Sequence, residues 1–599
     1  MATSTHLLSA TDYVVFVFLL MISAFVGLYH AAFKGRQRTS KEYFLANRSM
    51  HPLPVAVSLA VSIVSAVTFI GTPALSYVYG PAFWQTIFGR ILSAVIVSFV
   101  FCPVLYNLKI TSIYEYLERR FNRIVRYIAM FIQLLSTLLI LGVVVYAPAL
   151  ALNAVTGISL FGSILAVGII STFYSTIGGI KAVVWNDVIQ SSIMVIGFIL
   201  IIIVGCIKVG GIEEVWSRAI EGNRTFAFDF RPDPTIRLSF WSTSIGGIFL
   251  VLTYVGTNQN QAQRFLTCKD LRSAEIATFC GICLVAVLEM LAVLSGIVIY
   301  AFYFRCDPLK NGFIAKADQI VPFFAVEVFR SVPGLTGLIV SAVCSASLST
   351  ISTAINGIVT VVGEGGIKKL WPQLSDAKFT KIMKMVSVIC GLMFMLMAGF
   401  ASVAGSMVIP LGHGLIGAHG GAVAGVFLLG ILIPWGNTNG ATAGIITGAL
   451  IGTWILIGSV IYPPISTPLP LSNDRCPVND TFIFTTTTMT TLTASDSHSI
   501  ATNMPFDMED SRTGITRLYS ISFFYFAVVS CLSSLFVGIV ISLLFPCKDL
   551  VDANLLSPFV VEACQRLPQT LRDKCPIRFT DNDVRETKTV DVALLTTQL

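Results

Sequence analysis

Residues 340–357 read VSAVCSASLSTISTAING, and they lie in an apolar segment that is long enough to cross a bilayer. On a helix, Ala346, Ser349 and Thr350 fall at positions i, i+3 and i+4, so they share one face. Hydroxyl and carbonyl oxygens at this spacing suit a small hard cation such as sodium, if a neighbouring helix adds unwound backbone carbonyls. The alternative is that small hydroxylated residues only allow helices to pack closely. The stretch by itself leaves both interpretations open.

The composition is typical of a membrane protein. Of 599 residues, 55% are hydrophobic and 12% are charged, and the mean hydropathy is +0.80. A soluble domain carries about twice this charged fraction. The net charge of +7 comes from basic residues spread over several loops, so no nucleic-acid partner is expected. The 13 cysteines form no CxxC motif or Cys/His cluster, and the apolar segments hold no nucleophile–base pair, so an enzyme is not expected.

The hydrophobic pattern predicts an all-α polytopic membrane protein. At about 20 apolar residues per span, we expect thirteen transmembrane helices, at 11–31, 53–79, 82–106, 124–150, 158–177, 183–207, 240–263, 275–304, 321–362, 382–404, 408–433, 441–462 and 518–545. The ninth segment is too long for one straight helix. We expect it to begin with an amphipathic extracellular piece, followed by the span itself near 335–360.

The distribution of lysine and arginine predicts the orientation. Three short loops are rich in these residues, namely 32–51, 107–123 and 363–384, whereas the short loops on the other side, 80–81, 151–157 and 405–407, have none. The loop at 208–237 on that other side is basic, but it is long and therefore weighs less. The N-terminus is therefore expected outside and the C-terminus inside. On this topology the sequons at Asn223 and Asn479 lie outside and carry glycans, while the sequon at Asn47 lies inside and stays unmodified.

The extracellular loops and the C-terminal tail carry weaker signals. Cys306 and Cys476 are the only cysteines in predicted outside loops, and whether they pair is open. Residues 1–546 form the predicted transmembrane domain, and 547–599 form a polar cytoplasmic tail that we expect to be disordered. The tail ends in Thr-Gln-Leu at 597–599, a pattern that PDZ domains accept by strand addition; a tail without a partner is the alternative.

The second predicted span has the composition of a discontinuous helix. Pro52, Pro54, Gly71 and Pro73 surround the polar stretch VSIVSAVT at 61–68. Glycine and proline near mid-span are typical of helices that break and expose backbone polar groups inside the protein. A proline-kinked structural helix is the alternative.

Three further features place polar side chains at or within the membrane. Asp187 lies just inside the sixth span, where a carboxylate is functional by default; an interfacial aspartate in water is the alternative. The run NQNQAQR at 258–264 indicates a hydrated pathway or cytosolic gate, or else simple solvation of a helix end. His413 and His419 lie in a glycine-rich span, either as functional residues or as hydrogen-bonding residues in helix packing.

Several stretches together resemble the sodium/solute symporter family. They are TSIYEYLERRFN at 111–122, STIGGIKAVVWNDVIQ at 175–190, GTNQNQAQRF at 256–265, PGLTGLIVSAVCSASLSTIS at 333–352 and GSVIYPP at 458–464. Within the family, the chain looks most like the branch of sodium-coupled monocarboxylate, multivitamin and iodide transporters, and most of all like the monocarboxylate transporters.

The resemblance implies a fold and a set of sites. The fold would be two inverted five-helix repeats of the LeuT type, made of spans two to six and seven to eleven. The family's sodium site matches Ala346, Ser349, Thr350 and the backbone carbonyls of Val61 and Val64. A second-sodium or exit-path position matches Asp187 and Ser352. The substrate site would lie near Ser65, Thr68, Thr253 and Tyr254, to which we add His413.

The chain departs from the family pattern near the expected outer vestibule. Residues 73–80 read PALSYVYG where the branch has P-S-E-x-Y-R-F-G, so the glutamate and the arginine around Leu75 and Val78 are missing. The sodium residues are intact. The expected function is sodium-coupled import of small organic anions at the plasma membrane by alternating access. The alternatives are a multivitamin or iodide transporter, or a non-transporting, sodium-conducting sensor on the same scaffold.

Overall fold

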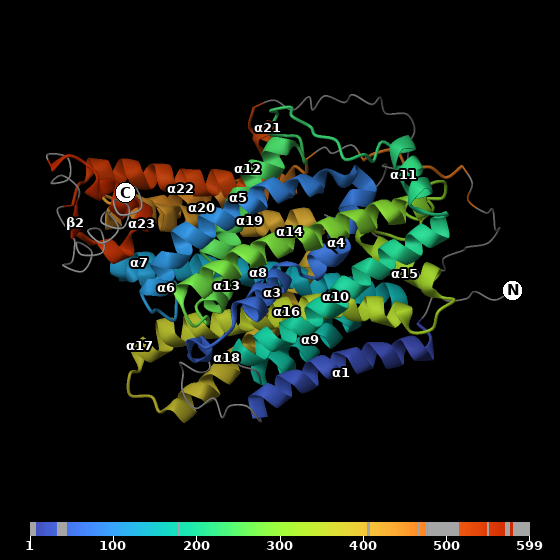
Figure 1. Ribbon diagram of the computed structural model, residues 1–599, viewed down its shortest axis with the longest axis horizontal. Helices are drawn as coiled ribbons and strands as arrows, with labels where there is room; N and C mark the ends of the chain where they lie inside the picture. Colours follow the sequence, from blue (N-terminus) through green and yellow to red (C-terminus); the bar gives the residue numbers. More distant parts are fainter. Residues whose placement is uncertain are drawn as a thin grey trace, which may run out of the picture.

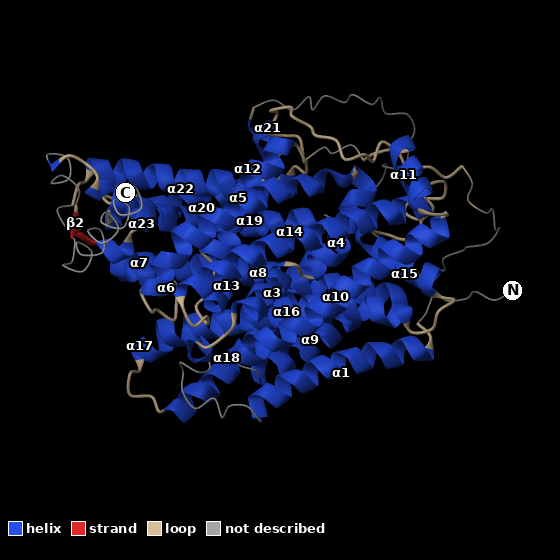
Figure 2. Ribbon diagram, viewed as in Figure 1, coloured by secondary structure: helices blue, strands red, loops and turns tan. Residues whose placement is uncertain are grey.

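The computed structural model describes residues 8–32, 45–177, 180–403, 408–464, 468–474, 476, 514–547, 550–569 and 576–578. Within these residues the protein is a bundle of long helices, and the two short strands lie at one end of it (Figure 2). Among the described residues, nine helices are long and apolar enough to cross a membrane. Two pairs of shorter helices form bent spans, and the apolar stretches Ala10–Ile22 and Leu160–Phe173 fill the two remaining predicted spans. The prediction of a polytopic helical membrane protein is confirmed.

The first half of the bundle follows the predicted order closely. Its elements are α1 (Ala10–Ala32), η1 (Ala46–Arg48), α3 (Pro52–Ile63), α4 (Ala66–Tyr79), η2 (Pro81–Gln85), α5 (Thr86–Ile96), η3 (Val97–Phe101), α6 (Cys102–Asn107), α7 (Tyr114–Arg120), α8 (Arg123–Thr156), α9 (Leu160–Ile177) and α10 (Ile180–Val209). The bent pair α3 and α4 meets at 58°. This pair is the first span of the first predicted repeat.

The second predicted repeat also begins with a bent span, because α12 (Phe240–Val251) with η4 (Leu252–Gly256) meets α13 (Gln259–Phe265) at 69°. The other elements up to its end are α11 (Ile212–Glu221), α14 (Leu271–Phe302), η5 (Ala317–Gln319), α15 (Ile320–Phe329), α16 (Leu335–Val362), η6 (Gly363–Ile367), α17 (Lys368–Leu370), α18 (Asp376–Val403) and α19 (Val408–Leu432). The elements after it are α20 (Thr438–Ile461), α21 (Ile515–Tyr519), α22 (Tyr525–Leu544), β1 (Val551–Asp552), η7 (Ala553–Leu555), α23 (Pro558–Gln565) and β2 (Ile577–Arg578).

The ninth predicted segment divides as its length requires, but its first part differs from the prediction. The span itself, α16, begins at Leu335, close to the expected position. The preceding α15 is a separate helix, and apart from Phe323 and Glu327 its residues are buried. It packs against α4, α8 and α16. The expectation of an amphipathic surface piece is therefore wrong, because neighbouring helices cover both sides of α15.

The most central helix is α16. In the span Leu335–Leu370, 89% of the most apolar window is buried, against 28% for Lys378–Val403 in α18. Some of its hydroxyl groups bond the preceding turn of the same helix: Ser341 donates to the Gly337 carbonyl at 2.8 Å, and Thr360 donates to that of Asn356 at 2.7 Å. Such bonds to the preceding turn remove most of the cost of burying a polar side chain. In contrast, the outer helices present large apolar side chains such as Phe161 and Phe400 outward, as a lipid-facing surface requires.

The two ends of the bundle carry different features. Figure 1 shows α7, α17 and α23 at one end and α11 and α15 at the other. At the first end Glu118 of α7 pairs with Arg126 of α8 and with Lys369 of α17. Burial opposes the ionisation of Glu118, but the hydrogen bonds and charges of Lys369 and Arg126 outweigh it and lower the pKa to about 2. The basic loops that orient the chain therefore meet around one ionised carboxylate.

The opposite end is held together by a disulfide. Cys306 and Cys476 are bonded, with their Cα atoms 4.8 Å apart, so the open question of their pairing is answered. The segment 468–474 next to Cys476 lies across the helix ends: Leu469 donates to the Val78 carbonyl at 3.0 Å, and the Asp307 amide donates to the Ser472 carbonyl at 3.1 Å. Both cysteines thus lie at the end of the bundle that we predict to be extracellular.

The C-terminal tail departs from the prediction of disorder. Residues 550–569 and 576–578 form β1, η7, α23 and β2, and the two strands pair in parallel. Tyr116 of α7 donates to the Leu555 carbonyl at 3.1 Å, and the Ser557 amide donates to the Ile431 carbonyl at 3.0 Å. These bonds attach the tail to the helix ends beside α7. The last three residues, 597–599, lie outside the described residues.

One prediction concerns the glycans. Asn223 is exposed and its neighbour Arg224 donates to the Pro470 carbonyl at 3.2 Å, next to the disulfide-linked segment. Asn479 lies outside the described residues. Changing Asn223 and Asn479 together to glutamine should remove the glycosidase-sensitive mobility shift of the protein on a gel. Asn47→Gln is the matched control and should leave the shift unchanged; a glycan on Asn47 would reverse the orientation.

Candidate functional site

The discontinuity predicted in the second span is real, and it lies between Val64 and Ser65. Val64 has φ −79° and ψ 80°, outside the helical region, and Ser65 is extended. The Ser65 hydroxyl accepts a hydrogen bond from the Val67 amide at 3.2 Å and thereby caps α4. The chain breaks here and not at Gly71 or Pro73, since α4 continues through both. An added Cβ at Gly71 would lie 2.7 Å from side chains of α19, so this glycine serves close helix packing.

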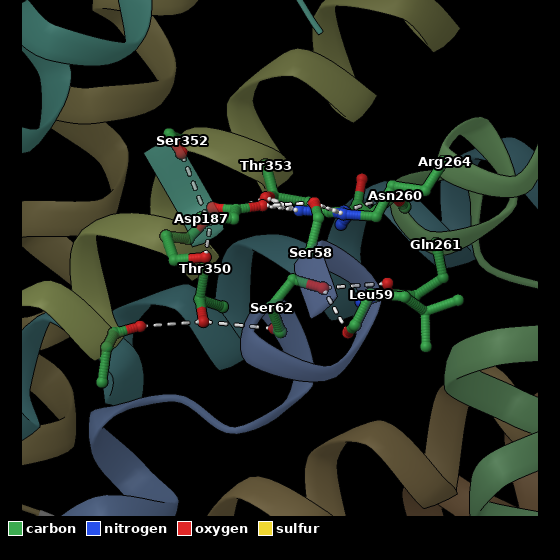
Figure 3. A network of polar contacts seen from close by, with 12 residues as sticks. Ser58, Leu59, Ser62, Asp187, Asn260, Gln261, Arg264, Thr350, Ser352 and Thr353 are labelled. Carbon is green, nitrogen blue, oxygen red and sulfur yellow. Dashed lines mark hydrogen bonds and ion pairs between the residues drawn. The ribbon is translucent and has the colours of Figure 1, made fainter. Parts of the chain in front are cut away.

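The break ends the helical hydrogen bonds of α3, so the backbone carbonyls that follow Ala60 need other partners. The Ala60 carbonyl accepts from the Val64 amide, and the Ile63 carbonyl accepts from the Ser65 amide at 3.0 Å. The Ser62 carbonyl accepts instead from the Thr350 hydroxyl of α16 at 3.2 Å (Figure 3). The structure therefore brings Thr350, one of the predicted sodium ligands, into contact with Ser62, which lies between the predicted ligands Val61 and Val64 in the chain.

The donor set at this contact fits sodium. Thr350 also donates to the Ala346 carbonyl at 3.2 Å, so the hydroxyl lies between the end of α3 and the preceding turn of α16. Carbonyl and hydroxyl oxygens are hard ligands, and the carboxyl end of a helix carries partial negative charge. Val61 and Val64 flank the Ser62 carbonyl in the chain. Because these oxygens are hard ligands without a net charge, they suit a monovalent cation.

Ser349 points to a different partner. Its hydroxyl donates to Asp187 Oδ1 at 2.6 Å, and the Ser58 hydroxyl donates to Asp187 Oδ2 at 2.5 Å. Asp187 and Arg264 are both completely buried, and the Arg264 Nη2 to Asp187 Oδ2 distance is 2.9 Å. Asp187 is thus a buried, paired carboxylate, which excludes the alternative of an interfacial aspartate in water.

The buried ion pair ties four helices together. From α13, Arg264 also donates to Ser58 of α3 at 2.7 Å and to Thr353 of α16. Ser352 donates to the Ser349 carbonyl at 3.1 Å and adds no direct bond to Asp187 among the described residues. Figure 3 shows this network running from Asp187 toward Arg264, beside the Thr350–Ser62 contact. Sequence reasoning identified Asp187 but did not identify Arg264 as its partner.

A cavity of about 120 Å³ lies next to the break. All five residues predicted for the substrate site line it: Ser65, Thr68, Thr253, Tyr254 and His413. Ser62 and Thr350, which contact each other, line it too. The Thr350–Ser62 contact and the predicted substrate residues therefore line the same cavity, although they come from five helical elements.

The sequence analysis did not predict two charged residues that line this cavity. Among the described residues that line the cavity, Arg90 of α5 is the one guanidinium and Glu289 of α14 is the one carboxylate. Arg90 Nε donates to Glu289 Oε2 at 2.6 Å, Nη2 donates to Oε1, and Nη1 donates to the Tyr254 hydroxyl. A charged residue in an apolar span is a functional signal. Applied to the spans 82–106 and 275–304, this rule would have identified both.

The amide run near the second bent span is mostly buried, so solvation of a helix end does not explain it. Asn258 caps α13 by accepting from the Asn260 amide at 2.9 Å. Gln261 accepts from the Ser62 hydroxyl at 2.9 Å and so connects the two bent spans. Gln259 bonds the loop before α7 through Thr111 and Ile113. Asn258, Asn260 and Gln261 also line the cavity, as a polar pathway requires.

The two histidines differ in position. His413 Nδ1 lies 3.0 Å from the Ile409 carbonyl, and its ring packs against Phe83, Phe523 and Phe524 at the cavity. His419 Nδ1 lies 3.2 Å from the Leu415 carbonyl, and its Nε2 lies 3.3 Å from the Thr453 hydroxyl. Both rings bond the preceding turn of their own helix, as the packing alternative expects. Only His413 of the two reaches the cavity lining.

Comparisons with known proteins bear on the family and the fold. The profile of the sodium:solute symporter family matches residues 43–448. The chain is 40% identical over 537 residues to sodium-coupled monocarboxylate transporter 2 of Homo sapiens, a match that covers 89% of this chain and 84% of that protein. It is 36% identical over 539 residues to the sodium/iodide cotransporter of Homo sapiens, which covers 89% of this chain and 83% of the relative.

One solved structure, a Na⁺-coupled sialic acid symporter in a substrate-bound outward-open state, has the same fold. The TM-score is 0.68 at 24% identity, covering 90% of this chain and 98% of that chain. At this identity the likeness bears on the fold alone. The family profile and the relatives carry the assignment. This chain belongs to the sodium:solute symporter family.

Proposed function

We propose that this protein imports small monocarboxylate anions together with sodium across the plasma membrane, by alternating access. The substrate class comes from the relatives named as sodium-coupled monocarboxylate transporters, at about 40% identity over most of the chain. The observation that carries the proposal is that Thr350 and Ser62 line the same cavity as the five predicted substrate residues. Residues 1–546 are the transport domain in this proposal, and 547–599 are a cytoplasmic tail with a PDZ ligand at its end.

Within this proposal the sodium ligands are Ala346, Ser349 and Thr350, with the carbonyls of Val61 and Val64. The contact between Thr350 and the Ser62 carbonyl, at 3.2 Å, supports the assignment. Asp187 and Ser352 form the second-sodium or exit-path position. The bond from Ser349 to Asp187, at 2.6 Å, links the two sets of residues. A sodium ion at the first set would draw Ser349 into its coordination shell, so the two positions would respond to each other.

The first experiment is a radiolabelled uptake screen in sodium against choline, with current recorded in parallel. Lactate, pyruvate, nicotinate, biotin, pantothenate and iodide are compared side by side in cells that express the protein. Sodium-dependent uptake of the short monocarboxylates supports the proposal. Uptake restricted to biotin and pantothenate, or to iodide, would move the protein to the corresponding relatives. Sodium current without uptake of any compound would identify a sensor and reject the transport proposal.

A second prediction tests the sodium ligands. Thr350→Ala should raise the sodium concentration for half-maximal uptake by about tenfold, the equivalent of ~1.4 kcal/mol for one lost oxygen ligand. Ser341→Ala is the matched control, because Ser341 is a buried hydroxyl of the same helix that bonds only backbone carbonyls, those of Gly337 and Phe16. Its sodium dependence should match the wild type. An unchanged sodium dependence of Thr350→Ala at normal surface level would reject Thr350 as a ligand.

A further inference from the structure

The arginine in the cavity is the feature that the general transport scheme does not use. A buried carboxylate substrate needs a counter-charge or strong hydrogen-bond donors, since an uncompensated anion is costly away from water. The side chains of Leu75 and Val78 supply neither. Arg90 is 4% exposed and lines the cavity, so its guanidinium is the one cationic group of the described lining that meets this need.

The geometry leaves part of this guanidinium available to a ligand. Its bonds to Glu289 and Tyr254 occupy three N–H groups, one each on Nε, Nη1 and Nη2. An arginine side chain has five, so one N–H remains on each of the two terminal nitrogens. That edge can hold a carboxylate with two parallel bonds. Tyr254 uses its oxygen as the acceptor from Arg90, and its own O–H can donate to the same carboxylate.

Glu289 holds the guanidinium in this position. It accepts two bonds from Arg90, and the Thr86 hydroxyl of α5 donates to it at 3.2 Å. The pair is fully desolvated, with exposed side-chain fractions of 4% and 6%. Because its charges cancel, the pair adds no net charge to the cavity. A bound monoanion then brings one unbalanced negative charge, which a sodium ion at the Ser62–Thr350 wall of the same cavity compensates.

We propose that Arg90 and Tyr254 form the subsite for the substrate's carboxylate, and that Glu289 is a positioning residue that makes anion binding depend on sodium. This inference rests on the proposed function and adds the residues that select a monocarboxylate. It predicts opposite effects for the two partners of one ion pair. Removing Arg90 removes the anchor, whereas neutralising Glu289 frees the positive charge of the anchor.

The test measures uptake of radiolabelled lactate, its KM and its sodium dependence, with surface protein quantified for every variant. Arg90→Gln should raise the KM by about ten- to hundredfold, the effect of losing bonds to a charged group. Glu289→Gln should lower the KM and reduce the sodium requirement, because Arg90 alone then balances the anion. Arg119→Gln is the matched control: it breaks an exposed Arg–Glu pair on α7, and its KM should equal that of the wild type.

A double variant separates binding from folding. If the pair served only to hold α5 to α14, Arg90→Gln with Glu289→Gln would restore both surface level and wild-type KM, and this result would overturn the proposal. The proposal expects restored surface level with the high KM of Arg90→Gln. Unlabelled lactamide, the neutral analogue, should compete with lactate poorly in the wild type and no worse than lactate in Arg90→Gln.

The remaining outcomes distinguish this inference from the proposed function. If the wild type takes up no monocarboxylate, both fail together. If it takes up lactate but Arg90→Gln keeps the wild-type KM, the inference fails and the function stands. Alanine differs from lactate by an ammonium group in place of the hydroxyl. If alanine competes better than lactate, Glu289 itself binds the ligand and the role of a positioning residue is wrong.

Discussion

Asp187→Asn should reduce sodium-coupled uptake to less than about one tenth of the wild-type level, because it leaves the buried Arg264 without its counter-ion. Both side chains are 0% exposed, and Arg264 Nη2 lies 2.9 Å from Asp187 Oδ2. Arginine does not release its proton in proteins. Breaking a buried pair by removing one partner costs about 3–5 kcal/mol. The remaining bonds of Arg264, to Ser58, Thr353 and the Asn260 carbonyl, are uncharged and do not replace the carboxylate.

The loss has a structural and a functional part, and a second variant separates them. In Asp187→Asn with Arg264→Gln, no charge is left unpaired, so surface level should recover. Sodium coupling should not recover, because the carboxylate next to Ser349 is still absent. The measurements are surface biotinylation and uptake over a series of sodium concentrations. Normal surface level and unchanged sodium dependence in Asp187→Asn alone would contradict a role for this residue in coupling.

Transport should be electrogenic, and it should concentrate the substrate more than a thousandfold. A tenfold sodium gradient is worth about 1.4 kcal/mol per ion. One sodium with one anion is electroneutral, so it concentrates the substrate only about tenfold. Two sodium ions contribute about 2.8 kcal/mol and carry one net charge inward, which gains ~2.3 kcal/mol per 100 mV. The total of about 5 kcal/mol corresponds to a ratio above a thousand.

The proposed second position at Asp187 and Ser352 motivates this stoichiometry, and the neutral pair of Arg90 and Glu289 is consistent with it. With that pair balanced, each anion needs one sodium for its own charge, and a second sodium supplies the net inward current. Two-electrode voltage clamp with lactate should therefore show an inward current that grows at negative potentials. Voltage-independent uptake without current would reject the second sodium.

The order and number of the membrane spans followed from the sequence alone. A bilayer requires about 20 apolar residues per span, so each span can be recognised from the hydrophobicity of its own residues. The hydroxyl-rich face of residues 340–357 and the break in the second span also rest on local chemistry. The exact position of that break could not be predicted from the sequence. Gly71 and Pro73, the residues that most strongly suggest a break, lie inside α4, and the chain leaves the helical conformation at Val64 and Ser65 instead. Ser65 stabilises the break as a helix cap, a role that any serine can take.

The sequence by itself determined the spans, the family and the residues of the predicted sodium and substrate sites. Only the tertiary structure decided which buried charges are partners. Asp187 meets Arg264 from 77 residues away, and Arg90 meets Glu289 from 199 residues away. A charge in an apolar span must be compensated because desolvation is costly, but this requirement states only that a partner exists. Which partner it is depends on how the helices cross, and that is set by packing over the whole bundle.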